Sequence, residues 1–179
     1  MSHLPDKSLL KIQLASQLEL NEQRIIPSTT TKARIYTDGA YKSEGKYQGS
    51  AWGAVLRTYR THAVCSGLCP KETNSSEMAE LWAIWYGLKA LCTSMDTSRI
   101  KYLIFRSDSQ IVCTWLGWKS DTVWIEEPSI PALELLIRIM ETAEANSMRL
   151  QVLWVDSKRS NARQPSIWNR LADQLARKA

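Results

Sequence analysis

Three β-type runs in succession, followed by alternating strands and helices, constrain the fold of this chain most. Five strands are expected, at residues 33–37, 50–59, 62–68, 99–105 and 148–155. A short link at Arg60-Thr61 predicts a tight hairpin between the second and third strands. An antiparallel meander followed by strand–helix–strand crossovers predicts an α/β fold, in which ligands gather outside the carboxyl ends of the parallel strands.

Apolar residues that recur every three or four positions predict helices at residues 74–92, 111–116, from Ser129 or Pro131 to 145, and from Pro165 onward. The inward face of the first helix is expected to consist of Met78, Leu81, Trp85, Leu88 and Cys92. Asn74 and Glu77 have the spacing of a capping box. Glu80 lies on the stripe that borders the apolar face, and it is either a solvated flank residue or a carboxylate that points along the sheet.

Four acidic residues lie where their carboxylates could meet. Asp38 is expected at the end of the first strand, Asp108 at a strand-to-helix junction, and Glu80 and Asp173 on helices. Three of them also have a simple structural alternative, which is an Asp-Gly turn for Asp38, helix capping for Asp108 and a surface ion pair with Arg177 for Asp173.

Four converging carboxylates would repel one another strongly without compensating cations. Hard divalent cations take oxygen ligands, and magnesium is typically bound by a few carboxylates together with waters and substrate phosphates. Two such ions about 3.5–4 Å apart clamp the attacking and leaving oxygens of a phosphodiester. The acids therefore predict a site for metal-assisted phosphodiester hydrolysis.

Four segments in this order resemble the motifs of the type 1 ribonuclease H family: Tyr36-Thr37-Asp38-Gly39-Ala40, Met78-Ala79-Glu80-Leu81, Ser107-Asp108-Ser109-Gln110 and residues 169–176. The resemblance runs from about residue 33 to residue 179. It implies a mixed five-stranded sheet, three strands antiparallel and then parallel, flanked by helices. It also implies endonucleolytic cleavage of the RNA strand of RNA–DNA hybrids, which leaves 5′-phosphate and 3′-hydroxyl ends.

The resemblance further implies that Asp38, Glu80, Asp108 and Asp173 are catalytic and bind two Mg²⁺ ions, with Mn²⁺ as an alternative and with Asp38 and Asp108 between the two ions. The residues expected to contact the hybrid are Gly39, Asn74, Ser76, Gln110, Trp118, Lys119, Lys158 and Arg159. For Trp118 the alternative is packing, and for the basic residues it is solvated surface charge.

The chain departs from the family pattern in two places. The asparagine pair that many members carry before the helix glutamate falls here on Ser76 and Glu77, while Asn74 is displaced. The loop before the final helix lacks the histidine of many members, and Lys158 or Arg159 could take its place.

Composition bounds the remaining expectations. A net charge of +5 permits a polyanionic partner, and with only two histidines the four cysteines have no partners for a zinc site. Reduced thiols favour the cytoplasm or another reducing intracellular compartment. No apolar run approaches the ~18 residues of a membrane span, and no signal-peptide core is apparent. Residues 1–32, with a short helix from residue 7 to residue 20, are expected to be an extension of a domain at 33–179, and we expect a monomer.

Three other functions compete with that of a hybrid-cleaving enzyme. The fold could serve as a catalytically idle module that binds hybrids, or as the ribonuclease H part of a reverse transcriptase polyprotein. It could also belong to a different nuclease or integrase of the same superfamily. Crowded carboxylates favour an enzyme, because a surface that only binds phosphates gains nothing from them.

Overall fold

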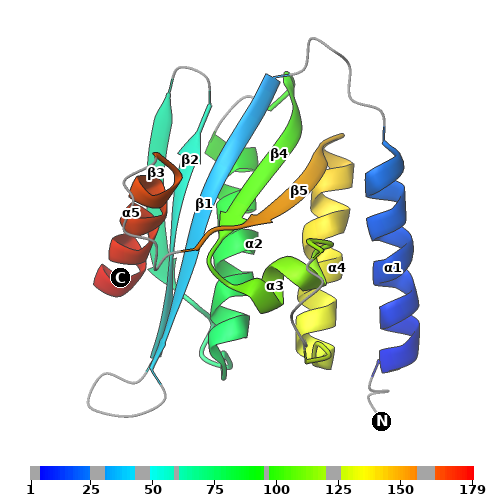
Figure 1. Ribbon diagram of the computed structural model, residues 1–179. Coiled ribbons are helices and arrows are strands. Elements are labelled where there is room, and N and C mark those ends of the chain that lie inside the picture. The colour runs from blue at the N-terminus through cyan, green and yellow to red at the C-terminus, as the bar shows by residue number, and fades with distance from the viewer. Residues whose placement is uncertain are drawn as a thin grey trace.

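The computed structural model describes residues 5–24, 31–42, 49–58, 61–94, 97–119, 126–156 and 164–179 (Figure 1). The elements are α1 (Lys7–Gln23), β1 (Thr31–Lys42), β2 (Gly49–Arg57), β3 (His62–Leu68), α2 (Ser76–Ser94), β4 (Ile100–Ser107), α3 (Gln110–Trp115), α4 (Ile130–Ala145), β5 (Arg149–Trp154) and α5 (Gln164–Lys178). From β1 onward this is the order of strands and helices that the sequence predicted.

The five strands form one mixed sheet in the order β3-β2-β1-β4-β5. β2 pairs antiparallel with both β1 and β3, whereas β4 pairs parallel with β1 and β5. The predicted α/β fold with a mixed five-stranded sheet is therefore confirmed. The crossover through α2 places β4 beside β1, so that the chain segments after these two parallel strands meet at one end of the sheet.

Helices cover the two faces of the sheet unequally (Figure 1). α2 and α4 lie on one face, and α5 lies on the other, where it contacts β1, β2 and β3. The core between the sheet and the first pair of helices contains fully buried residues from β1, β4, α2 and α4: Ile35, Phe105, Leu81, Ile84, Leu88, Leu133 and Leu136. Full burial of each such side chain contributes about 1.5–3 kcal/mol.

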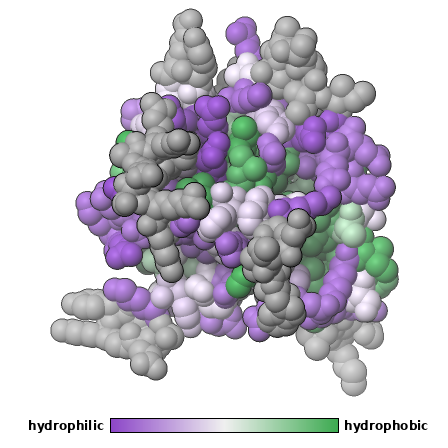
Figure 2. All heavy atoms as spheres, viewed as in Figure 1, coloured by the Kyte–Doolittle hydropathy of each residue, from purple (hydrophilic) through white to green (hydrophobic). Residues whose placement is uncertain are grey.

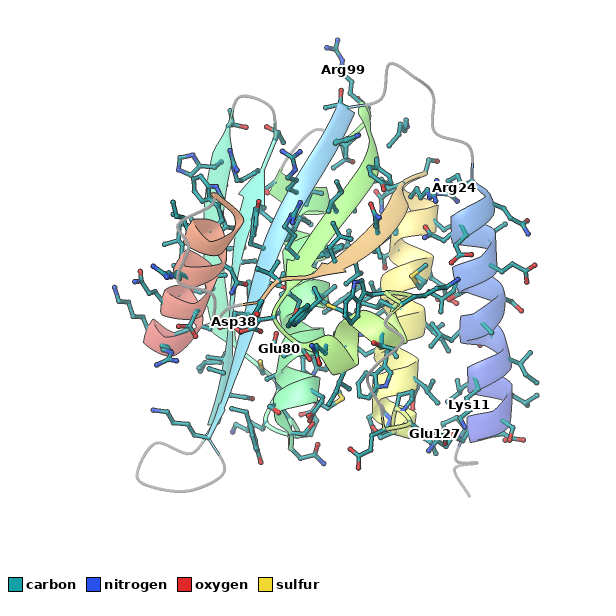
Figure 3. All side chains as sticks on the ribbon, in the orientation of Figure 1. Lys11, Arg24, Asp38, Glu80, Arg99 and Glu127 are labelled. Atoms are coloured by element: carbon teal, nitrogen blue, oxygen red, sulfur yellow. The ribbon has the colours of Figure 1, made fainter. Side chains whose placement is uncertain are left out.

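α1 packs against the outer side of α4. Asn21 closes a pair of hydrogen bonds with the backbone of Leu150, donating to its carbonyl over 2.6 Å and accepting from its N–H over 2.9 Å. Arg24 donates to the Met148 carbonyl at one end of the helix, and Lys11 pairs with Glu127 at 2.7 Å near the other end (Figure 3). Part of the expected extension is thus a helix that lies on the sheet domain.

The prediction that Asp38 ends the first strand is wrong. β1 continues to Lys42, and Asp38 and Gly39 pair within it with Gly53 and Trp52 of β2. The glycine does not turn the chain. It allows the backbone of α2 to contact the strand, since a Cβ at Gly39 would lie 2.3 Å from the Ala79 carbonyl carbon.

Two expectations for α2 also need correction. The helix is capped by Ser75, whose Oγ accepts from the N–H of Met78 at 3.1 Å, and not by a box of Asn74 and Glu77. The stripe expected to border the apolar face is itself buried, from Glu80 through Ile84 and Gly87 to Leu91. Because α2 packs flat on β1 and β2, this stripe faces the sheet, while Trp85 and Cys92 are only half-buried.

The predicted link at Arg60-Thr61 lies partly outside the described residues, and the N–H of Thr58 donates to the Thr61 carbonyl across it at 2.9 Å. All four cysteines are free thiols. Within the described ranges, the helices are too short or too polar to cross a bilayer.

Candidate active site

The site forms where β1 and β4 diverge. Their parallel pairing ends at Tyr36 and Arg106, and Asp38 and Asp108 each follow two residues later along the chain. Glu80 reaches the same place from the first turns of α2, close to Asp38 (Figure 3). One carboxylate oxygen from each of these three acids lies within 4.8 Å of the others. The sheet and α2 therefore bring together three acids that are distant in sequence.

Two glycines bring helices close enough to build this cluster. At Gly39 the α2 backbone lies directly on β1, which places Glu80 next to Asp38, and the N–H of Gly39 donates a hydrogen bond to the Glu80 carboxylate. On β2, Gly53 lies opposite Asp38, and a Cβ there would lie 2.4 Å from the Ala172 carbonyl oxygen of α5. The next residue along α5 is Asp173.

Hydrogen bonds hold the segment after β4. The Trp154 indole N–H donates to the Asp108 carbonyl at 3.1 Å, and the N–H of Val155 donates to the Ser107 carbonyl at 2.8 Å. The Ser107 hydroxyl accepts from the N–H of Ser109 at 3.2 Å and donates to the Glu80 carboxylate at 3.4 Å. These bonds fix the backbone around Asp108 relative to Glu80 and β5.

Burial and mutual repulsion disfavour the charged forms of the acids. Burial, followed by the charge of Asp108, raises the pKa of Asp38 from its ordinary value of 3.8 to about 8. The pKa of Glu80 is raised well above its ordinary 4.5, by burial first and then by the charges of Asp38 and Asp108. Among the described residues, no lysine or arginine forms an ion pair with Asp38 or Glu80. A cation placed between these carboxylates would relieve the repulsion.

Asp173 lies at the edge of the cluster. Its carboxylate hydrogen-bonds to the Asp38 side chain, which favours a proton on Asp38. It also accepts a hydrogen bond from Arg177 Nε at 3.0 Å, the ion pair that the four-residue spacing suggested. Asp173 is not one of the three acids that come within 4.8 Å of one another. The structure thus places it next to Asp38 but in contact with solvent.

The other predicted site residues are distributed around the acids. Asn74 and Ser76 lie exposed at the start of α2, Gln110 is the first residue of α3, and Lys119 is exposed beyond the end of α3. Trp118 is half-buried, and its ring lies 5.7 Å from the ring of Trp154. Lys158 and Arg159 lie outside the described residues.

Sequence reasoning missed the positioning residues. Ser107 lay within a motif segment, but nothing in the sequence indicated its bond to Glu80. Trp154 was read only as part of a strand, and its bond to the Asp108 backbone depends on the parallel pairing of β4 with β5. The sequence left open whether Glu80 is buried. The small and apolar residues Gly87 and Leu91 on the same helical stripe were the signal that this stripe faces the sheet.

The fold and the cluster define a class of protein: an α/β protein of the ribonuclease H-like fold, with an acidic centre where the central strands diverge. A family model described as RNase H matches residues 30–179. The chain belongs to the RNase H family and is a ribonuclease H.

Solved structures agree with this fold. A type 1 enzyme, LC11-RNase H1 in complex with an RNA/DNA hybrid, superposes with a TM-score of 0.59 at 18% identity, covering 82% of this chain and 95% of that chain. RNase H1 from the halophilic archaeon Halobacterium salinarum gives a TM-score of 0.55 at 21% identity, covering 83% and 96%.

The fold also occurs inside a larger protein. The protease-reverse transcriptase of prototype foamy virus gives a TM-score of 0.56 at 18% identity and covers 88% of this chain but 22% of that chain. A comparison with curated protein sequences found no match.

Proposed function

We propose that this ribonuclease H cuts the RNA strand of RNA–DNA hybrids, with two divalent cations, Mg²⁺ or Mn²⁺, bound by Asp38, Glu80, Asp108 and Asp173. The observation that carries the proposal is the approach of three carboxylates to within 4.8 Å of one another in a place where two of them are almost fully buried. Membership of the RNase H family supports the reaction type.

The donor set fits hard cations. Carboxylate oxygens are the ligands that magnesium and manganese prefer, and burial makes the uncompensated charges of Asp38 and Glu80 unfavourable. When bound, such ions supply an activated water and stabilise the departing 3′ oxygen. The contribution of the chain is to hold the four carboxylates in place before substrate arrives, so that little reorganisation is needed at the moment of reaction.

Residues around the acids are suited to position the hybrid. We assign the backbone at Gly39 and the polar side chains of Asn74, Ser76 and Gln110 to the strand that is cut. Gly39 follows Asp38 in β1, Gln110 starts α3 two residues after Asp108, and Asn74 and Ser76 lie at the start of α2, which carries Glu80. Lys119, Lys158 and Arg159 would contact phosphates, and the half-buried ring of Trp118 would stack on sugars of the DNA strand. The hybrid in the LC11-RNase H1 structure supports a ligand of this class on the same fold.

The decisive experiment uses a hybrid labelled on its RNA strand. We expect cleavage with Mg²⁺ that leaves 5′-phosphate and 3′-hydroxyl ends, no cleavage of duplex DNA, and a loss of at least about 100-fold in kcat for Asp38→Asn and Asp108→Asn. Glu134→Gln, the same chemical change at an exposed position on α4, serves as the matched control and should retain activity.

Two outcomes would contradict the proposal. Cleavage that survives both substitutions would remove the assigned site. Tight hybrid binding without cleavage by either metal would instead favour a module that only binds hybrids. We also propose that the protein acts in a reducing compartment, which the four free thiols support. We further propose that it is a monomer, which sedimentation can test.

A further inference from the structure

The sheet carries a row of cations on the face that α5 only partly covers. α5 packs on β1, β2 and β3, and the upper part of β1, with β4 and β5, lies in front of α2 and α4 with no described helix over it (Figure 1). We call the cationic residues on this face, Lys32, Arg34, Arg57, Arg106 and Arg149, the basic face. In Figure 2, which looks onto the same side, hydrophilic side chains lie around a small hydrophobic area on the upper part of this face.

Strand register and ring contacts place these residues together. Lys32 and Arg149 are both in register with Tyr102, and their cationic groups lie 5.6 Å and 6.0 Å from the centre of its ring. Arg34 lies directly opposite Arg57 in the antiparallel pair of β1 and β2. Side chains paired across adjacent strands point to the same side of a sheet, so the cations form one surface.

Arg57 and Arg106 complete this surface nearer to α5 and the acids. The Arg57 guanidinium stacks on the ring of Trp168 in α5 at 4.3 Å. Arg106 precedes Asp108 by two residues, and its Nε is buried without a hydrogen-bond partner among the described residues. The basic face therefore extends to the edge of the candidate active site.

The charges of the basic face are not compensated within the described chain. None of its five cations forms an ion pair with a described carboxylate. By contrast, Lys7 and Lys11 on α1 pair with Glu127. Like charges directly opposite each other, as at Arg34 and Arg57, destabilise a sheet. A bound polyanion would remove this cost.

We propose that the basic face binds the phosphate backbone of the nucleic acid that extends beyond the segment held at the acids, a proposal that rests on the proposed function. Strands rise about 3.3 Å per residue. Along β4, Arg106 therefore lies about 7 Å from Asp108, and along β1, Lys32 lies about 20 Å from Asp38. One continuous strand can span both sites. Phosphate contacts of this kind hold a substrate in register and carry no sequence preference.

The test compares binding of two fluorescent probes by anisotropy in EDTA, where the substrate stays intact. One probe is a 12-base-pair hybrid, and the other carries a 20-nucleotide single-stranded DNA extension, placed at either end in turn. We expect wild-type protein to bind one extended probe at least about 10-fold more tightly than the short probe. In the double variant Lys32→Gln/Arg34→Gln this gain should fall to about 2-fold or less. The negative slope of log K against log salt should also become shallower by about 1.4, because two single-strand phosphate contacts are lost.

Lys89→Gln/Arg138→Gln removes the same charge from exposed positions on α2 and α4 and should keep the full gain. Arg149→Gln is a second variant, which should lose part of the gain, and circular dichroism checks that each variant folds. Equal gains in wild type and Lys32→Gln/Arg34→Gln would overturn the inference. An equal loss of the gain in the control variant would also overturn it. Poly-glutamate that displaces the extended probe as strongly as single-stranded DNA does would overturn it as well.

The two proposals fail separately. Cleavage of the short hybrid by wild-type protein in Mg²⁺ tests the proposed function without reference to the extension. The gain from the extension in EDTA tests the basic face without reference to cleavage.

Discussion

At the scale of single residues, the candidate site depends on groups that hold the acids as much as on the acids themselves. Asp108 follows β4, and its carbonyl accepts the indole N–H of Trp154 from β5. Ser107 connects the same segment to the Glu80 carboxylate. A displacement of about 1 Å in a catalytic group can reduce the rate of a positioned reaction about 100-fold, so these bonds matter for chemistry as well as stability.

Trp154→Phe tests this positioning role. The substitution removes the bond to Asp108 while retaining an aromatic ring, and we expect a loss of about 1 kcal/mol in stability and about a 10-fold lower kcat with little change in KM. Trp115→Phe is the matched control, because its indole N–H donates to the Glu126 carbonyl at 2.9 Å. Similar kcat values for the two variants, measured under single-turnover conditions, would contradict the role of Trp154.

At the scale of elements, the contact between α2 and β1 decides the geometry of the site. Gly39 lets the helix backbone lie against the strand, and Ser75 caps the helix beside this contact. The buried stripe of α2 then orients Glu80 toward the sheet. Glu80 is 8% exposed because of where the helix packs.

Gly39→Ala should therefore disrupt more than its own position. The added Cβ would meet backbone atoms of α2 at 2.3 Å, which only a shift of the helix can relieve, and we expect a loss of about 3 kcal/mol in unfolding free energy together with weaker activity. Gly87→Ala is the control within α2, because its Cβ would meet a side-chain methyl of Ile35 at 3.2 Å. Alanine also favours a helix over glycine by about 1 kcal/mol. Equal urea midpoints for the two variants would show that the close approach at Gly39 is unimportant.

At the scale of the whole molecule, the acidic cluster and the basic face place opposite charges on one sheet. The acids gather where β1 and β4 diverge (Figure 3). A further cation that is not part of the basic face, Arg99, lies at the opposite end of β4. Among the described residues, Asp38, Glu80 and the five cations of the basic face form no ion pair, and like charges gathered in one place lower the stability of the folded protein in the absence of ligands. Cations at one region and phosphates at the other would compensate these charges.

The pH dependence of unfolding in EDTA tests the charge of the acidic cluster. Because the folded-state pKa of Asp38 is raised from 3.8 to about 8, its contribution to stability is fully present below pH 3.8 and is lost as the pH rises through 8. Asp38→Asn mimics the protonated form. One pKa unit corresponds to about 1.4 kcal/mol, and 1 kcal/mol shifts Tm by about 2–4 °C in a domain of this size. At pH 9 we therefore expect this variant to unfold at least about 5 °C above wild type.

The difference between Asp38→Asn and wild type should shrink at pH 5, where wild-type Asp38 already carries a proton. Glu134→Gln should show no such change with pH. A constant difference across the range, measured by thermal denaturation, would mean that Asp38 is charged in the folded protein without metal.

The sequence by itself determined the order of the elements, because alternation and helical periodicity are local properties of the chain. It also marked Asp38, Glu80, Asp108 and Asp173 as acids that could meet, and the tertiary structure brings the first three together with Asp173 beside Asp38. Only the tertiary structure decided that β1 continues past Asp38, that Gly39 serves helix packing, and that Glu80 is buried. Each of these depends on a contact between segments far apart in sequence, and the local pattern of residues carries no information about which backbone will lie against which.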